Sequence, residues 1–595
     1  MKKNFILSPV LLLLAFVFAS CEKDNQLEDG LIPVYCEPLG NGTKVSVIDD
    51  VKSRWVEGDE ISINGQTTQV LFSNGQACVR YTANANSVNR AVYPASMVGE
   101  STSFASDEID VTFPAEYHYR EADGHQQIEI PMVAKSTGTD ALQFKHLTGA
   151  LCVQLYNNSG AEVLVRSVTI ASDNSQLSGP CTVDVYTAAI TTRVTDPTSA
   201  QKKVTLLFDH GLKVTNGNTR KVLIPVLPVG DGNHFTVTVD FCQPSELSHA
   251  FRFTKTQPSG GALPRNILGY AKTELKTSGE GITTQPLLQC SGQNCYISTP
   301  LDFILLTQAI NTQASYVPAS GFTNYYYKGN IFLNNDIDMS GDTINPIVDF
   351  QGNIQGYGHT ISNLTIKSIN VAGSYYCAVF YNNYGSSPIT ETNFDEISLL
   401  HIGATTGTLT IGGLFAFVKG ALSISNCRMN IKEIKTTDIV SGAIYVGGLL
   451  GELRSGNADE MSIDISNSNV TIQNSILKGS STIFYGNFIG QSSRKYNILF
   501  TQDTCEVNVS LDTESSIRIG GFVGNKMRDG FNASNCIING TLSARTNGRY
   551  NYCGKLVGYY DSYLASIIED NNTFSFAIKK NGEDVNITEL HSQTF

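Results

Sequence analysis

Glycine-rich clusters that recur at a nearly constant step dominate the last third of the chain. The three clearest copies carry paired glycines followed by apolar residues, at Gly412-Gly413, Gly447-Gly448 and Gly520-Gly521. Weaker copies begin at Cys377, Gly486 and Cys553, so the six starts are 35, 35, 39, 34 and 33 residues apart. A step of this size predicts stacked units that bury their apolar faces only against neighbouring units.

The segments between these clusters alternate polar and apolar residues, as in 422–427 and 461–467. Alternation with period two favours strands, whereas helical repeats of this length need apolar residues three and four apart. Glycine suits the corners between strands because it permits close backbone approach. We therefore predict a right-handed parallel β-helix or a similar β-solenoid, with rungs about 4.8 Å apart.

A Ser-Asn pair recurs in the same part of the chain, with the asparagines at Asn363, Asn426, Asn467 and Asn535. Stacked on successive rungs, these residues could form a turn or a side-chain amide ladder along the axis. A row of polar ligand contacts is the functional alternative.

The stretch before the first cluster has a pattern of its own, in segments 333–341, 345–347, 350–352 and 356–364. It resembles the first rungs of bacterial surface proteins with GLUG-type repeats, whose core motif is also similar to the paired-glycine clusters. The resemblance covers about residues 296–558, with departures at Ala416, Asn487 and Lys555. It implies a β-helical stalk or binding surface that carries no catalysis.

The start of this C-terminal domain, which we place at 296–595, predicts a short helix. Thr299 is a suitable N-cap, and Pro300 suits the first turn. The apolar run 301–310 would then form a helix that covers the open first rung.

The N-terminus has the pattern of a signal peptide, with Lys2-Lys3, an apolar run at 5–18 and small residues before Cys21. Pro9 interrupts the run, which is shorter than the roughly 20 residues that a membrane-spanning helix needs.

The cysteine in this position resembles the lipobox of bacterial lipoproteins, and the charged start of the mature chain resembles lipoproteins of the Bacteroidota. The resemblance implies a signal peptide at 1–20, acylation of Cys21, and a lipid-anchored linker at 21–29. It places the protein in the outer membrane, anchored by lipid and exposed at the surface or carried on fimbriae.

Composition limits the remaining classes of function. Charged residues make up only 16% of the chain and the net charge is −13 without a basic run, so nucleic acid is not expected as a partner. Among the 13 cysteines, Cys290 and Cys295 could close a small loop, and Cys427 and Cys536 should be buried thiols. The chain lacks zinc-ligand spacing, and no cofactor is expected.

The region before residue 280 reads as many short strands with turn signals, which predicts antiparallel β-sandwiches. The motifs at 55–61, 90–94 and 144–155 resemble those of the fimbrillin family of the Bacteroidota. This resemblance implies two fimbrillin-like sandwiches, at 30–140 and 141–280. Trp55, the only tryptophan, is expected to be a core anchor.

Fimbrillins assemble by giving a strand to the open groove of a neighbour, and family members can lose an N-terminal segment after a basic residue. Candidate cleavage positions here are Lys44, Lys52 and Arg54. Because a solenoid follows the second sandwich, strand donation would be obstructed while acceptance remains open. The resemblance therefore implies a tip or accessory subunit, or a surface lipoprotein that does not polymerise.

An enzyme in the solenoid would need clustered carboxylates. The best cluster, Asp336, Asp338 and Asp342, has spacing that could hold calcium, although aspartates at a turn often bond backbone amides instead. Asp395-Glu396 suits a solvated loop and His359 a structural turn. The chain carries no familiar hydrolase or phosphate-loop motif, so we expect no catalytic residues.

Tyrosines crowd the first rungs, and Tyr326 and Tyr376 are candidates for a face that binds glycan or protein. We expect an all-β surface lipoprotein that acts in adhesion or as a fimbrial accessory subunit. Its expected partners are other fimbrial subunits, a host or bacterial surface protein or glycan, and the outer membrane through the lipid. The alternative is a surface lipoprotein that binds or cleaves glycans.

Overall fold

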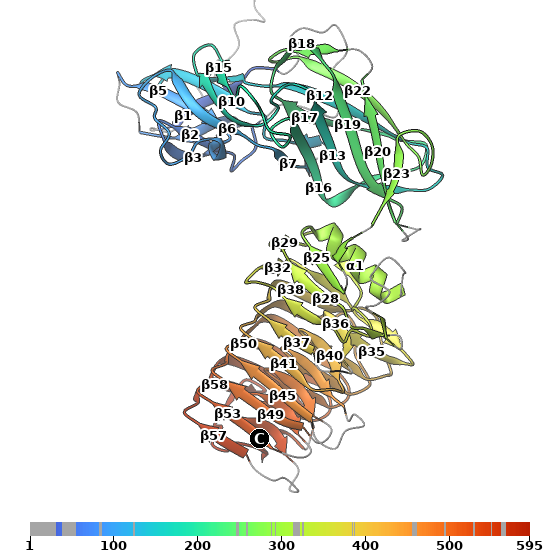
Figure 1. Ribbon diagram of the computed structural model, residues 1–595. Coiled ribbons are helices and arrows are strands. Elements are labelled where there is room, and N and C mark those ends of the chain that lie inside the picture. Colours follow the sequence, from blue (N-terminus) through green and yellow to red (C-terminus); the bar gives the residue numbers. More distant parts are fainter. Residues whose placement is uncertain are drawn as a thin grey trace, which may run out of the picture. The chain divides into compact units, whose positions relative to one another are not determined.

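The computed structural model describes most of the chain after residue 30 (Figure 1). The described residues are 31–38, 55–82, 86–122, 125–244, 249–257, 260–286, 288–291, 293–312, 322–323, 326–383, 385, 387–454, 461–492, 496–526, 530–548, 550–560 and 567–594. They fall into two compact units, one built mainly from residues before Thr283 and the other mainly from Thr283 onward. Strands form nearly all of both units, which confirms the prediction of an all-β chain.

Seven strands of the first unit close into a barrel. In spatial order they are β1 (Leu31–Cys36), β11 (Leu142–His146), β10 (Met132–Thr137), β5 (Val88–Tyr93), β2 (Glu60–Ile63), β3 (Gln66–Ser73) and β4 (Gln76–Arg80). Strand β1 closes the ring because it pairs parallel with β11 and antiparallel with β4. The first predicted sandwich is thus a closed barrel and not a pair of open sheets.

Trp55 anchors the barrel core, as expected. Its ring meets those of Tyr93 and Phe144 edge to face, with centroids 4.9 and 5.0 Å apart. All three side chains are buried. An aromatic cluster of this kind adds about 0.5–1.5 kcal/mol for each pair beyond simple area burial.

Strand pairing crosses the domain boundary that we predicted at residue 140. The motif at 144–155 spans two strands, of which β11 completes the barrel and β12 (Gly149–Asn157) enters a sheet of the sandwich. In the other direction, β6 (Glu108–Phe113) pairs with β14 (Gly179–Asp184), and β7 (Glu116–His118) pairs with β16 (Lys203–Val214). A short alternating motif identifies a strand but leaves its partner open, and this explains the difference.

Two further sheets form the sandwich of the first unit. The smaller has the order β17 (Thr219–Val226), β12 (Gly149–Asn157) and β22 (Leu268–Leu275). The larger has the order β23 (Ile282–Gln285), β20 (Ala250–Thr256), β19 (Phe235–Cys242), β13 (Val163–Ser172), β16 and β7. Smaller sheets join β14 to β15 (Ala189–Arg193), β18 (Val229–Asn233) to β21 (Gly261–Leu263), and β8 (Arg120–Ala122) to β9 (His125–Gln127). A short 3₁₀ helix spans Ala95–Met97.

The second unit is a parallel β-solenoid, as predicted from the repeat (Figure 1). Each full rung contributes four strands. One such rung consists of β41 (Leu422–Ser425), β42 (Arg428–Thr436), β43 (Ile444–Gly447) and β44 (Leu450–Leu453). Each strand pairs in parallel with its counterpart on the next rung. The stacked strands form four sheets, here called faces 1 to 4 in the order in which a rung visits them.

The remaining strands of faces 1 and 2 follow the same stacking. Face 1 also contains β25 (Asn294–Ile297), β28 (Asn330–Leu333), β31 (Asn353–Gln355), β37 (Ser387–Thr390), β45 (Met461–Ser466), β49 (Tyr496–Thr501), β53 (Phe531–Ser534) and β57 (Ile567–Asp570). Face 2 also contains β29 (Ile337–Asp338), β30 (Thr343–Ile344), β32 (Thr360–Ser362), β33 (Thr365–Lys367), β38 (Asn393–His401), β46 (Asn469–Gly479), β50 (Thr504–Thr513), β54 (Ile537–Thr546) and β58 (Thr573–Lys580).

Faces 3 and 4 are built from shorter strands. Face 3 also contains β35 (Ser374–Cys377), β39 (Leu409–Gly412), β47 (Ile483–Gly486), β51 (Ile517–Gly520) and β55 (Tyr552–Gly554). Face 4 also contains β36 (Phe380–Asn383), β40 (Phe415–Val418), β48 (Ile489–Ser492), β52 (Val523–Lys526) and β56 (Val557–Tyr560). Antiparallel strands are added by β24 (Gln289–Ser291), β34 (Ile369–Val371), β59 (Glu583–Val585) and β60 (Gln593–Thr594), and β26 (Phe322–Thr323) pairs with β27 (Tyr326–Tyr327).

The paired glycines form the corner between faces 3 and 4. Gly412, Gly447, Gly486, Gly520 and Gly554 lie in register at the ends of the face 3 strands. A Cβ on Gly447 would collide with the backbone oxygen of Leu450, so close backbone packing explains the glycine at this position. The sequence predicted this corner role correctly.

The helix predicted at 301–310 is α1 (Pro300–Thr312), beside β25. It begins with a reciprocal cap, because the Thr299 hydroxyl accepts the Asp302 N–H at 3.2 Å and the Asp302 carboxylate accepts the Thr299 N–H at 3.2 Å. A disulfide between Cys290 and Cys295 joins β24 to β25, within the loop that the sequence suggested.

Three of the four recurring asparagines occupy the corner between faces 1 and 2, whereas Asn363 lies between β32 and β33 of face 2. Asn426, Asn467 and Asn535 have φ values of 53°, 49° and 56°, and each backbone N–H bonds a carbonyl on the next rung. Their side chains are exposed, and no amide-to-amide bond joins them within the described chain. The left-handed backbone, and not an amide ladder, accounts for asparagine here. Cys427 and Cys536, which directly follow two of these residues, are buried free thiols as expected.

Candidate functional site

The structure does not support the predicted tyrosine face. Tyr376 is only 5% exposed and packs in a cluster with Ala378, Ala416 and Phe417. The side chain of Tyr326 lies outside the described residues, as does Cys21. Alternation alone could not show which residue of a tyrosine pair faces the core, and Tyr376 is the inward one.

The carboxylates of Asp336 and Asp338, two of the three aspartates proposed for calcium, accept hydrogen bonds from neighbouring residues instead. Asp338 accepts hydrogen bonds from the hydroxyl of Ser340 at 2.6 Å and from the amide of Asn363 at 2.8 Å. Asp336 accepts the N–H of Thr360 at 2.8 Å, and the N–H of Asp342 donates to the Met339 carbonyl. No group of three or more metal-ligating side chains occurs in the described part of the chain.

The most distinctive site lies on the sandwich of the first unit, where the sheet edge at β22 is open. The order β17-β12-β22 gives β22 a single partner among the described strands, the parallel neighbour β12. One side of β22 therefore offers backbone N–H and C=O groups to another strand.

The opposite edge of the same sheet is covered. The side-chain amide of Gln126, which is 4% exposed, donates to the carbonyl of Leu223 at 2.9 Å and accepts its N–H at 2.8 Å. Gln126 thus supplies to β17 the two bonds that a neighbouring strand would supply. The β17 edge of the sheet is therefore covered by a side chain, whereas the β22 edge is open among the described strands.

A groove of about 200 Å³ runs along the open edge, between β12 and β22 on one side and β19 and β20 on the other. Its apolar walls come from Leu151, Phe235 and Val237, each 6% exposed. Ala271 and Thr273 of β22 complete the lining from the open strand.

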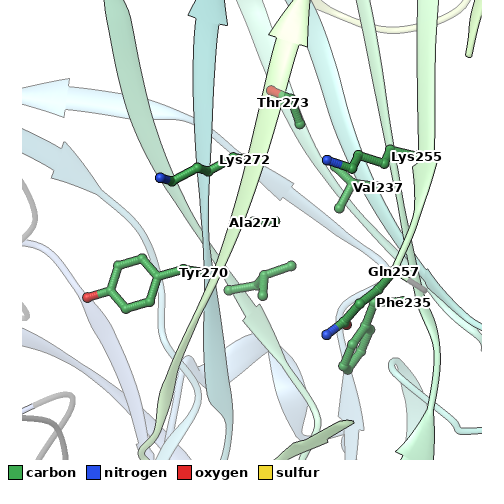
Figure 2. Close-up of a pocket in the computed structure, with 9 residues that line it drawn as sticks. Phe235, Val237, Lys255, Gln257, Tyr270, Ala271, Lys272 and Thr273 are labelled. Carbon is green, nitrogen blue, oxygen red and sulfur yellow. The ribbon is translucent and has the colours of Figure 1, made fainter. Parts of the chain in front are cut away.

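Polar side chains form the rim of this groove (Figure 2). Lys255 and Gln257 lie on one side, and Tyr270 and Lys272 on the other. All four side chains are exposed. The site therefore combines an unpaired strand edge, an apolar floor and two cationic rim residues, which is the arrangement that binds an extended peptide by β-strand addition.

This groove could not be predicted from the sequence. The alternation in 268–275 identifies a strand, but whether the strand ends a sheet depends on partners far along the chain. The pairing of β22 with β12 joins residues more than a hundred positions apart, such as Ala150 and Leu268.

No family model matches the chain, and no curated protein matches it. Solved structures share a limited likeness with part of it. A candidate cell adhesion protein from Bacteroides ovatus is 13% identical with a TM-score of 0.26, covering 43% of this chain and 94% of that one. A second, from Bacteroides uniformis, is 17% identical with a TM-score of 0.23, covering 44% and 97%.

A fimbrial protein from Bacteroides vulgatus is 11% identical with a TM-score of 0.23, covering 43% of this chain and 97% of that one. At these identities and scores the likeness carries no argument about what this chain does. In the described part of the chain, no helix is long and apolar enough to cross a membrane.

Proposed function

We propose that this protein is a non-catalytic subunit of the bacterial cell surface that acts in adhesion or at the tip of a fibre. In this proposal the first unit receives a strand from another subunit, and the solenoid presents a binding surface. Acylation of Cys21 would hold the chain at the outer membrane, and the lipid rather than a protein helix would be the anchor.

The open edge of β22 above an apolar groove is the observation that supports the proposal. An added strand could pair with the free backbone groups of β22 while its alternate side chains enter the groove lined by Phe235 and Val237. Without such a strand, the edge would be an aggregation hazard, since exposed edges recruit other strands. Gln126 protects the other edge of the same sheet from this hazard.

The proposal is tested by placing a photo-cross-linking phenylalanine analogue at Ala271 in cells that express the chain. A control with the analogue at Thr192, an exposed position on β15, reports non-specific capture. We expect an adduct at Ala271 alone, mapped by mass spectrometry to a segment of another surface protein with alternating apolar residues. Equal capture at both positions, or an adduct to a helical segment, would rule out strand addition at this groove.

A second variant, Ala271→Trp, fills the groove without removing its apolar walls. Because Ala271 is half-buried, the larger ring should be accommodated by the groove itself. We expect loss of the chain from native surface fibres, with Thr192→Trp incorporated normally. Normal incorporation of the Ala271→Trp chain would contradict the proposal.

A further inference from the structure

Two arginines of the solenoid, Arg454 and Arg518, lie over aromatic rings. The charge of Arg454 is paired with a carboxylate. The Arg454 guanidinium lies 4.3 Å from the ring centre of Phe417 and 5.3 Å from that of Tyr376. Its Nε is 2.7 Å from a carboxylate oxygen of Glu452. Burial acts to lower the pKa of Arg454, but Glu452 and Tyr376 outweigh it and the pKa lies above its ordinary value.

The second arginine, Arg518, has a similar aromatic surround. Its guanidinium lies 4.2 Å from the ring centre of Tyr559, 5.1 Å from that of Phe484 and 6.0 Å from that of Tyr552. Contacts of this kind hold a guanidinium flat against aromatic faces.

Arg518, however, has no carboxylate beside it, among the described residues, that corresponds to Glu452. Glu452, Gln491 and Asn525 lie in register on face 4, so an amide takes the place of the carboxylate beside Arg518. Arg518 donates from Nη1 to the Asn525 side-chain oxygen at 2.8 Å. Within the described residues it makes no ion pair, and its buried Nε has no hydrogen-bond partner.

A half-buried guanidinium without a counter-ion is unfavourable, because desolvation of the charge is not repaid by an anion. Burial lowers the pKa of Arg518, in contrast to Arg454. An external carboxylate would compensate the charge, since the terminal N–H groups of a guanidinium bind carboxylates through charge-assisted hydrogen bonds. We therefore expect Arg518 to bind an anion from outside the chain.

The surrounding rings favour an anion carried on a sugar. Tyr552 and Tyr559 are half-exposed, with ring centroids 4.9 Å apart and planes inclined by 60°. Tyr445 and Phe484 continue the aromatic row on neighbouring rungs, with centroids 5.0 Å apart. These half-exposed rings offer apolar surface to successive pyranose rings along the solenoid axis, whereas an acidic peptide would use the cation alone.

We propose that Arg518, Tyr552 and Tyr559 form a binding site for an acidic glycan, with a sugar carboxylate on the guanidinium and the sugar ring against the tyrosines. The site is separate from the groove at β22 and does not depend on strand addition. Its recognition combines one charge-assisted contact with ring stacking, so both parts can be tested.

The test measures binding of the purified chain to oligogalacturonate and to sialyllactose by calorimetry. The neutral counterparts are the methyl esters of the same two sugars, which keep the rings and remove the negative charge. We expect at least one acidic sugar to bind at least tenfold more tightly than its neutral counterpart, with affinity falling as sodium chloride is raised. Binding of neither acidic sugar, or equal binding of the neutral forms, would overturn the proposal.

Substitutions test whether the acidic sugar binds at this site. Arg518→Gln should weaken acidic-sugar binding at least tenfold, and Tyr552→Ala should weaken it several-fold. Arg545→Gln is the matched control, because Arg545 is an exposed solenoid arginine already paired with Asp512. Equal effects of the Arg518 and Arg545 substitutions would overturn the assignment.

A polyglutamate peptide distinguishes a glycan site from a general anion site. We expect it to bind more weakly than the acidic sugar and to be insensitive to Tyr552→Ala. Peptide binding as tight as that of the sugar, with the same response to the variant, would overturn the glycan assignment. The melting temperature of each variant shows whether it is folded. Arg518→Lys keeps the charge but loses the planar group, so it should bind the acidic sugar less tightly than the parent chain.

Discussion

The carboxylate of Asp503 accepts a hydrogen bond from the backbone N–H of Ser468, at 2.8 Å, between neighbouring rungs of the solenoid. Its second oxygen accepts the N–H of Thr501 at 3.0 Å. The side chain is fully buried, and burial raises the pKa of Asp503 to about 7, although these two backbone bonds act to lower it. One acidic group inside the stack therefore titrates near neutral pH.

This titration makes stability depend on pH. The folded state holds the Asp503 proton up to about pH 7, whereas an unfolded carboxyl releases it near pH 4. The contribution of Asp503 to stability should fall as pH rises from about 4 to about 7 and then level off, by a few kcal/mol in all. Asp503→Asn should have a smaller difference in unfolding free energy between pH 5 and pH 8 than the parent chain, measured with denaturant. An unchanged slope would contradict the assignment.

The buried His401 should change stability with pH in the opposite direction. Its Nδ1 lies 2.8 Å from the Ser368 hydroxyl, and burial lowers its pKa below the ordinary value. The unfolded imidazole gains a proton as pH falls through about 6.5, while the folded one resists it, so stability should be lost below that pH. His401→Gln should reduce the loss of melting temperature between pH 7 and pH 5.

The glycine corner predicts a sharp difference between two glycine substitutions. Gly447→Ala should lower stability by roughly 1–3 kcal/mol or more, because its Cβ would collide with the Leu450 carbonyl. Gly230→Ala is the control, since a Cβ there meets nothing within 4 Å. Thermal unfolding compares the two, and equal shifts would show that the corner is not close-packed.

The left-handed corner gives a second pair of variants. Asn467 has a φ of 49° and an exposed side chain, so Asn467→Gly should be nearly neutral. Asn467→Val should destabilise by about 1–2 kcal/mol, because a β-branched residue strains this backbone region. If the asparagine side chain were itself essential, glycine would be as harmful as valine.

Acylation of Cys21 remains a prediction from sequence. Labelling with a fatty-acid analogue should mark the wild-type chain in cells but not Cys21→Ser. The variant should also fractionate away from the outer membrane, because the lipid is the proposed anchor. Membrane retention of Cys21→Ser would show that another feature holds the chain at the surface.

The sequence was most informative where structure is local or periodic. The step between Gly412 and Gly447 predicted the solenoid, and Thr299 with Pro300 predicted the start of α1. It was least informative where partners are distant. Alternation could not show that β11 closes the barrel, that Tyr376 faces inward, or that β22 ends its sheet, because each depends on residues far along the chain.

Amide hydrogen exchange of β22 tests the central proposal most directly, comparing the free chain with the chain in native surface fibres. In the free chain, the β22 amides that do not face β12 should exchange faster than the Leu223 amide, which Gln126 protects. In fibres, the same β22 amides should slow at least tenfold while Leu223 is unchanged. Equal exchange of β22 in both states would contradict strand addition at this edge.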